Sequence, residues 1–196
     1  MSKILQSPLH DFHVEKKARM VPFAGWEMPV QYKGIIEEHK AVREAAGLFD
    51  VSHMGEARVS GVDAAAFLDY MTTNSIGNLK NNSARYSILC KEDGGCVDDI
   101  IVYKETDTDF LLCLNAANTG KDIEWLQKHV MSFNCSVEDV SGDYAQLALQ
   151  GPAAHAILGE LTDASVLPDK PFRMVRADLD GVSVLITTTG YTGEKG

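Results

Sequence analysis

The sequence is poor in cysteine, and its cysteines show no pairing motif. The four cysteines lie in apolar or strand-like runs, and none belongs to a C-x-x-C pair. They are Cys90, Cys96, Cys113 and Cys135. Disulfide frameworks and zinc sites usually show regular cysteine spacing. We therefore predict reduced cysteines in the core of a cytoplasmic protein.

Metal-ligand patterns and clustered positive charge are also missing. His10 and His13 have a spacing that could place both on one helical face, but the sequence offers no third ligand beside them. The formal net charge is −10, and the lysines and arginines are scattered along the chain. Binding to a nucleic-acid backbone needs clustered cations. We therefore predict no metal and no nucleic-acid partner.

Long apolar runs are absent as well. No stretch has the length of a membrane-spanning helix, and the N-terminus lacks a signal-type apolar run, so we predict no membrane partner. The last residues, TTTGYTGEKG, are rich in glycine but match neither common nucleotide-binding glycine pattern. They resemble a loop that should lead into a further element, which suggests a fragment cut inside a functional loop.

The composition that is present suits a globular α+β protein. The 196 residues are 45% hydrophobic and 23% charged, which is enough for one large or two small domains with a real core. Hydrophobic periodicity predicts mostly antiparallel sheets with flanking helices. Helices are expected at 34–46, 63–72, 120–131 and 152–161, and strands at 56–60, 84–90, 95–104, 110–114, 135–140, 143–149, 172–179 and 182–188.

We expect the chain to have three parts. Residues 1–50 form an N-terminal segment that packs on the body, and residues 51–140 form a first α+β lobe. Residues 141–196 begin a second, truncated lobe. A two-residue turn at Asp180 and Gly181 is a strong hairpin signal within this last part.

Residues 94–104, GGCVDDIIVYK, place two adjacent carboxylates inside a sequence typical of a buried β-strand. Because side chains alternate across a strand, Asp98 and Asp99 lie on opposite faces, and one should point inward. Two interpretations stay open. In the first, one aspartate is exposed to solvent at an edge of the sheet and the other accepts a hydrogen bond from a backbone amide. In the second, a carboxylate in an apolar cavity binds a cationic or N–H bearing ligand.

The strands on either side of residues 91–94 are close enough to form a hairpin. A loop with an even number of residues places Tyr86 and Asp99 on the same face, whereas an odd loop separates them. We predict the four-residue loop, so that Tyr86, Asp99 and Tyr103 converge. Asn115, at the end of the next strand, could bond a ligand, although such an asparagine more often stabilises a turn.

Six motifs of this sequence, in their order and spacing, resemble those of the aminomethyltransferase of the glycine cleavage system, the T-protein family. The motifs are FAGWEMPVQY, LFDVSHMGE, GGCVDDIIVY, LNAAN, LQGP and TGYTGE. The similarity begins at about Leu9 and continues to the end. It implies a three-lobed cloverleaf fold around a folate cavity, of which this chain holds two lobes, the second of them truncated.

The resemblance also implies an activity. Such a transferase takes the aminomethyl group from the lipoyl arm of the H-protein, passes its methylene to tetrahydrofolate and releases ammonia. Tetrahydrofolate is then the co-substrate, lipoylated H-protein the partner, and no metal is needed. In the family, the second aspartate of the GG-x-x-DD motif is the key acid near the folate ring, which is Asp99 here. The folate-binding residues implied by the family lining and by the shared strand face are Met54, Tyr86, Asp99, Tyr103, Asn115 and Tyr191.

One departure from the family and two alternatives bear on this interpretation. Thr188 stands where the family usually has an arginine, which weakens any salt bridge expected there. Non-catalytic folate-binding proteins of the same fold assist iron-sulfur or tRNA-modification pathways, but their cysteine-bearing glycine motif is not seen here. Outside the family, the alternative is an α+β binding module in which Asp99 is structural.

Overall fold

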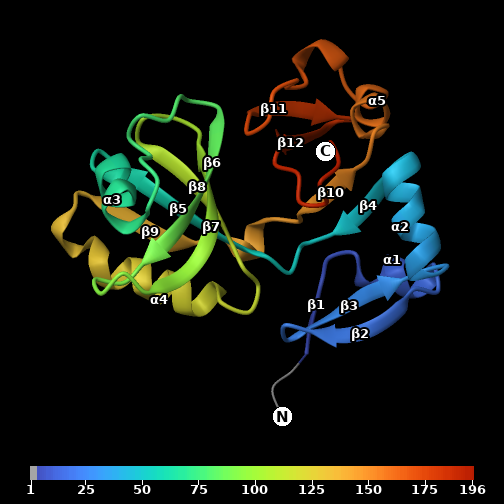
Figure 1. The fold of residues 1–196 in the computed structure, drawn as a ribbon, viewed down its shortest axis with the longest axis horizontal. Helices are drawn as coiled ribbons and strands as arrows, with labels where there is room; N and C mark the ends of the chain where they lie inside the picture. Colours follow the sequence, from blue (N-terminus) through green and yellow to red (C-terminus); the bar gives the residue numbers. More distant parts are fainter. Residues whose placement is uncertain (1–3) are drawn as a thin grey trace. The chain divides into compact units, whose positions relative to one another are not determined.

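The computed structural model describes residues 4–196, which divide into two compact units (Figure 1). Unit 1 contains the chain up to His53 together with residues 145–171 and 175–196, and unit 2 contains residues 54–144 and 172–174. The predicted division into 1–50, 51–140 and 141–196 stays a prediction about domains. The structure combines the beginning and the end of the chain in one unit, because strands from both segments pair with each other.

Unit 2 is built on a five-stranded antiparallel sheet with the order β6-β7-β8-β5-β9. Its strands are β5 (Gly55–Gly61), β6 (Ser83–Cys90), β7 (Cys96–Lys104), β8 (Asp109–Leu114) and β9 (Cys135–Asp139). The helices of this unit are α3 (Ala64–Met71) and α4 (Thr119–His129), followed by the short 3-10 helices η1 (Val130–Ser132) and η2 (Ser141–Asp143). Both α-helices pack on β5 and β9.

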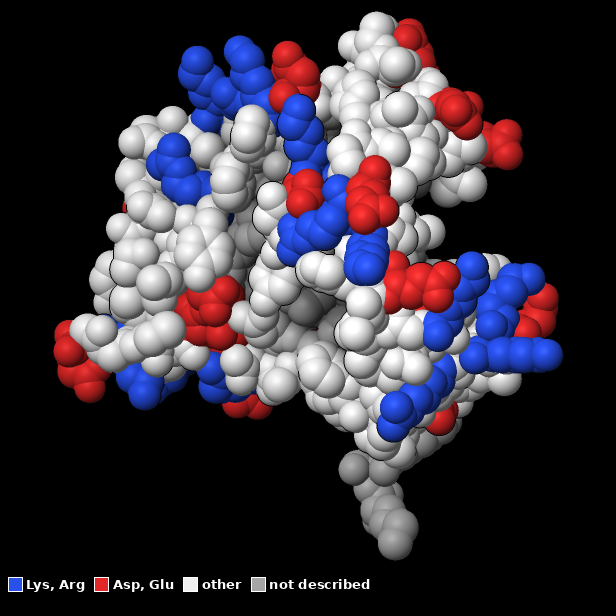
Figure 2. Space-filling model, turned by 45° about the vertical axis from the view of Figure 1, so that its right-hand side comes forward, with Lys and Arg blue, Asp and Glu red and all other residues white. Residues whose placement is uncertain are grey.

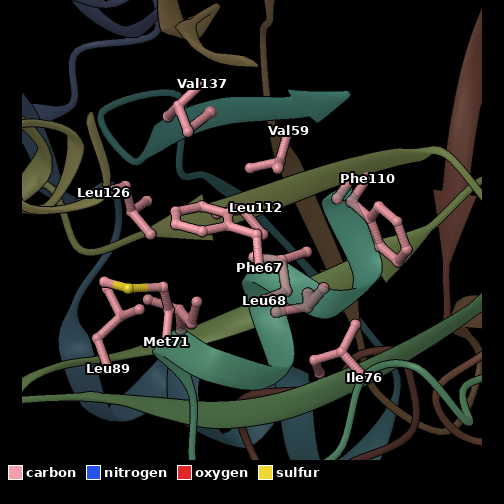
Figure 3. Packing of buried hydrophobic residues seen from close by; sticks show 14 of the residues in the cluster. Val59, Phe67, Leu68, Met71, Ile76, Leu89, Phe110, Leu112, Leu126 and Val137 are labelled. Atoms are coloured by element: carbon pink, nitrogen blue, oxygen red, sulfur yellow. The ribbon is translucent and has the colours of Figure 1, made fainter. Parts of the chain in front are cut away.

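The hydrophobic core of unit 2 lies between these helices and one face of the sheet. Figure 3 shows Phe67 and Leu68 of α3 and Leu126 of α4 among apolar side chains of the strands, including Val59 and Leu112. All five side chains are completely buried. Full burial of such a side chain contributes about 1.5–3 kcal/mol relative to exposure. The opposite face of the sheet carries Asp99, Ile101 and Tyr103 of β7.

Unit 1 contains three small sheets. They are formed by β1 (Leu5–Gln6), β3 (Trp26–Gln31) and β2 (Arg19–Phe23), by β4 (Gly47–Asp50) with β10 (Leu147–Gln150), and by β11 (Met174–Leu179) with β12 (Val182–Thr187). The first residue of β11, Met174, is assigned to unit 2. The helices are α1 (His10–Glu15), α2 (Ile35–Glu44), α5 (Ala154–Gly159) and the 3-10 helix η3 (Ala164–Val166). Apart from the parallel pair β1 and β3, the strand pairs are antiparallel. The predicted α+β class with mostly antiparallel sheets is confirmed.

A buried polar cluster joins the N-terminal segment to β4 in unit 1. The Asp50 Oδ2 atom accepts hydrogen bonds from Ser7 Oγ at 2.5 Å and His13 Nε2 at 2.8 Å, and the Tyr32 hydroxyl lies 2.5 Å from His13 Nδ1. Although burial opposes it, hydrogen bonding from His13 and Ser7 lowers the pKa of Asp50. Asp50 is therefore ionised at neutral pH, and it accepts hydrogen bonds from two donors of the N-terminal segment.

Two tight turns and one shortened strand show where the sequence-based expectation agrees with the structure and where it differs. Asp180 and Gly181 have φ values of 52° and 86°, which confirms the predicted two-residue hairpin turn. A second turn of this kind, at Ala24 and Gly25 between β2 and β3, was not predicted as a hairpin. The expected strand at 143–149 is shorter than predicted, because η2 covers its beginning and only Leu147–Gln150 forms a strand.

The surface carries charges of both signs. Figure 2 shows basic side chains in several separate groups on the face that it displays, with acidic side chains among them. Within residues 4–196, no helix has the length and apolar character needed to cross a membrane.

Candidate functional site

The hairpin of β6 and β7 places Asp99, but not through the predicted loop. The connection covers residues 91–95, one residue more than expected, since Cys90 pairs with Cys96. A register shift follows, because Leu89 pairs with Asp98 and Val97 is left as an extra residue in β7. The predicted loop length is therefore wrong. The longer loop and the extra residue each shift the pairing by one residue. The total shift is two residues, so each side chain of β7 lies on the face that we expected.

Tyr86 and Asp99 do lie on the same face of the sheet. Tyr86 pairs with Ile101, which is two residues from Asp99 and hence on the same side of β7. The Tyr86 side chain hydrogen-bonds the Asp99 carboxylate, and this bond raises the pKa of the Tyr86 hydroxyl. Tyr103 follows on this face and pairs with Ala84. The predicted shared face is confirmed.

The two aspartates differ in burial in a way that corrects one expectation. Asp98 is the inward residue, with an exposed fraction of 8%, whereas Asp99 is exposed. Asp98 lies on the core face with Ile100 and Val102, because side chains alternate along β7. The apolar cavity considered for one carboxylate of this pair is therefore not formed around Asp99 by the described residues.

Asn115 connects the two aspartates. It directly follows β8, and the pairing of Ile101 with Cys113 brings it opposite Asp99. Its Nδ2 atom lies 3.1 Å from Asp98 Oδ1, 3.0 Å from the Asp99 backbone oxygen and 3.5 Å from Asp99 Oδ1. The Asn115 side chain thus ties the end of β8 to both aspartates of β7. Its bond to a ligand stays a prediction.

Two further buried acids were missed in the sequence. Glu56, in β5, is 5% exposed, and burial together with the nearby Asp139 charge raises the pKa of its carboxyl to about 7. Asp122, in α4, is completely buried. Its helical spacing from Leu126, four residues on, puts it on the apolar face of the helix, and this was the available signal.

The other predicted site residues are distributed over both units. Met54 directly precedes β5 and is half-buried in unit 2. Tyr191 is 97% exposed and belongs to unit 1. Its backbone N–H donates to Gln150 Oε1 at 3.2 Å, and the Thr192 hydroxyl donates to the same oxygen at 2.9 Å. Gln150 therefore brings the LQGP and TGYTGE motifs together within unit 1.

No ligand set for a metal gathers in the part of the chain that the structure describes. Among residues 4–196, no group of three or more histidine, cysteine, aspartate or glutamate side chains could hold a metal ion. Acidic residues do come together in pairs, Asp98 with Asp122 and Glu56 with Asp139, and Asp99 lies on the opposite face of β7 from Asp98.

Comparison with known proteins decides the family. Residues 9–196 match the family described as "GCVT N-terminal domain". The chain belongs to this family. It is 49% identical over 196 residues to a protein named "Aminomethyltransferase" from Desulfitobacterium hafniense (strain Y51), and 48% identical over 197 residues to one of that name from Listeria monocytogenes serotype 4b (strain F2365). Each match covers 100% of this chain and 54% of the relative, so the chain spans about half the length of these curated relatives.

Solved structures give the same result for the GCVT N-terminal domain. The "glycine cleavage system aminomethyltransferase T from Bartonella henselae" has a TM-score of 0.88 and 35% identity, over 98% of this chain and 52% of that one. The heterotetrameric sarcosine oxidase from Corynebacterium sp. U-96 has a TM-score of 0.58 and 20% identity, over 79% and 77%, and shares the fold alone. The resemblance inferred from the six motifs is confirmed.

Proposed function

We propose that this chain contributes the folate-side carboxylate of an aminomethyltransferase of the glycine cleavage system. In this reaction the methylene of the aminomethyl group on the lipoyl arm of the H-protein is transferred to tetrahydrofolate, and ammonia is released. The names of the relatives support this activity, as does the structural similarity to the Bartonella henselae protein. Tetrahydrofolate is the proposed co-substrate and lipoylated H-protein the proposed partner.

One observation carries the proposal. The exposed Asp99 carboxylate is held by the Tyr86 hydroxyl and the Asn115 amide. An ionised carboxylate accepts hydrogen bonds and donates none, so its natural ligand presents N–H groups or positive charge. A reduced pterin presents N–H groups, which fits this residue set. Met54, Tyr103 and Tyr191 are proposed to complete the folate-binding residues.

The chemistry gives the carboxylate a defined role. The tetrahydrofolate N5 amine attacks the methylene as its bond to the departing ammonia breaks, and positive charge develops on the carbon and on N5. N10 then attacks the same carbon while the carbon–sulfur bond breaks, so that the sulfur leaves as the dihydrolipoyl thiol of the H-protein. Asp99 stabilises that charge and orients the amine. Removing one preorganised electrostatic contact from an active site typically costs about 10²–10³-fold in kcat. Because Asp99 is exposed in the described chain, this effect requires that bound folate displaces water from it.

The proposal is tested with Asp99→Asn in a full-length protein that contains this chain. The variant keeps the size of the side chain but loses its charge, so turnover with lipoylated H-protein should fall about 10²-fold while the Kd for tetrahydrofolate changes little. Ammonia release and methylene-tetrahydrofolate formation are measured together. Glu138→Gln removes an exposed acid from β9 of the same sheet and serves as the matched control.

Three outcomes would contradict this role for Asp99. Unchanged turnover in Asp99→Asn would show that the charge is not used, and an equal loss of turnover and folate binding would make it a binding residue only. Folate binding by the unaltered full-length protein without ammonia release would instead support the non-catalytic folate-binding alternative.

A further inference from the structure

We propose that Asp122 is a positioning residue for Asp99: it donates a hydrogen bond to Asp98, which holds Asn115, and Asn115 in turn holds Asp99. The proposal rests on the catalytic role proposed above for Asp99. Asp122 itself lies in α4 and is completely buried, so it acts through its neighbours rather than on substrate.

The contact between the two buried carboxyl groups requires a proton. Asp98 and Asp122 are in hydrogen-bonding contact. Among the described residues, Asp122 Oδ2 and Asp98 Oδ2 accept no hydrogen bond from another donor, and Asp122 Oδ1 has the Lys121 ammonium at 3.2 Å. Two ionised carboxylates are acceptors only and repel each other, so one of them must carry the proton that joins them.

The environment assigns this proton to Asp122. Although burial opposes ionisation of Asp98, hydrogen bonding from Asp122, Asn118 and Asn115 lowers the pKa of the Asp98 carboxyl. Burial and the Asp98 charge raise the pKa of Asp122 to about 7. Lys121 opposes this shift, since its Nζ atom lies 3.2 Å from Asp122 Oδ1. The lysine is half-exposed and donates to the Val97 backbone oxygen at 2.5 Å. Solvent and this second acceptor therefore weaken the electrostatic attraction between Lys121 and Asp122.

Asn115 links the buried Asp98 carboxylate to the exposed Asp99 carboxylate. The same amide nitrogen is 3.1 Å from Asp98 Oδ1 and 3.5 Å from Asp99 Oδ1. If Asp122 could not donate, Asp98 would be a buried charge with one partner fewer, and it would reorient or take up water. The Asn115 amide would then lose a fixed acceptor, and the orientation of the Asp99 carboxylate would no longer be set.

Two substitutions at Asp122 separate hydrogen-bond donation from mere space filling. In the full-length protein, Asp122→Asn retains an amide donor for Asp98 and should keep kcat within about 3-fold of the unaltered protein, whereas Asp122→Ala should lower kcat about 10-fold or more with little change in KM for tetrahydrofolate. Glu124→Gln, an exposed change in the same helix, is the control. Equal kcat values for the two Asp122 variants would overturn the proposal.

The pH profile supplies a test that does not depend on the alanine variant folding. In the unaltered protein, kcat should fall as pH rises through about 7, because Asp122 loses the proton that it donates. Asp122→Asn has no such proton and should lack this decline. The same decline in both proteins would contradict the assignment.

Carbon-13 NMR of the Asp122 carboxyl in the unaltered full-length protein separates this proposal from the function on which it rests. A carboxyl that is protonated at pH 5 and titrates near pH 7 supports the donor role, and one that is already ionised at pH 5 refutes it. If Asp99→Asn left turnover unchanged, the proposed function would fail, while the NMR result would still report whether the buried pair shares a proton.

Discussion

Glu56 should make the stability of unit 2 depend on pH, and Glu56→Gln should remove this dependence. Its carboxyl is 5% exposed, and burial followed by the Asp139 charge raises the pKa from 4.5 to about 7. The folded state therefore binds a proton that the unfolded state releases between these pH values. The stabilisation is fully present below pH 4.5 and is lost as pH rises to about 7.

The expected magnitude follows from this difference in pKa. One pKa unit corresponds to about 1.4 kcal/mol, so Glu56 lowers the free energy of unfolding by about 3 kcal/mol between pH 5 and pH 8. Glutamine has nearly the same shape but does not ionise. The stability of Glu56→Gln relative to the unaltered protein should therefore rise by about 3 kcal/mol over this pH range.

Tryptophan fluorescence can report on unit 2 alone. The chain has two tryptophans, Trp26 in unit 1 and Trp125 in unit 2. With Trp26→Phe as the common background, urea unfolding followed through Trp125 measures unit 2 at pH 5 and at pH 8. Glu138→Gln, an exposed substitution on the neighbouring strand β9, is the control. If Glu56→Gln has the same relative stability at both pH values, the raised pKa is refuted.

Two further predictions concern the core and the isolated chain. Leu112→Ala removes a completely buried side chain from β8 and should lower the free energy of unfolding by about 2–5 kcal/mol, measured by urea denaturation, whereas a change below 1 kcal/mol would contradict the packing in Figure 3. Calorimetric titration of residues 1–196 with tetrahydrofolate should show weak or no binding, because Asp99 is exposed in this chain. Tight binding would show that these residues alone form the folate site.

Alternation along the β7 sequence was enough to predict which side chains share a face. The positions of valine, isoleucine and tyrosine identify a strand, and alternation then requires Asp98 and Asp99 to point in opposite directions. The turn at Asp180 and Gly181 was equally local, since the residues that adopt positive φ are visible in the sequence. The six motifs carried the family assignment for the same reason: each is a short, contiguous pattern.

The packing of distant segments decided what local patterns could not. Which aspartate of the pair is buried depends on where α3 and α4 cover the sheet, and the sequence of β7 contains no information about those helices. Burial and the contact with Asp98, 24 residues away, raise the pKa of Asp122, and burial and the charge of Asp139 on another strand raise the pKa of Glu56. Local sequence thus determined strand faces and turns, whereas burial and charge depend on neighbours that only the folded chain brings together.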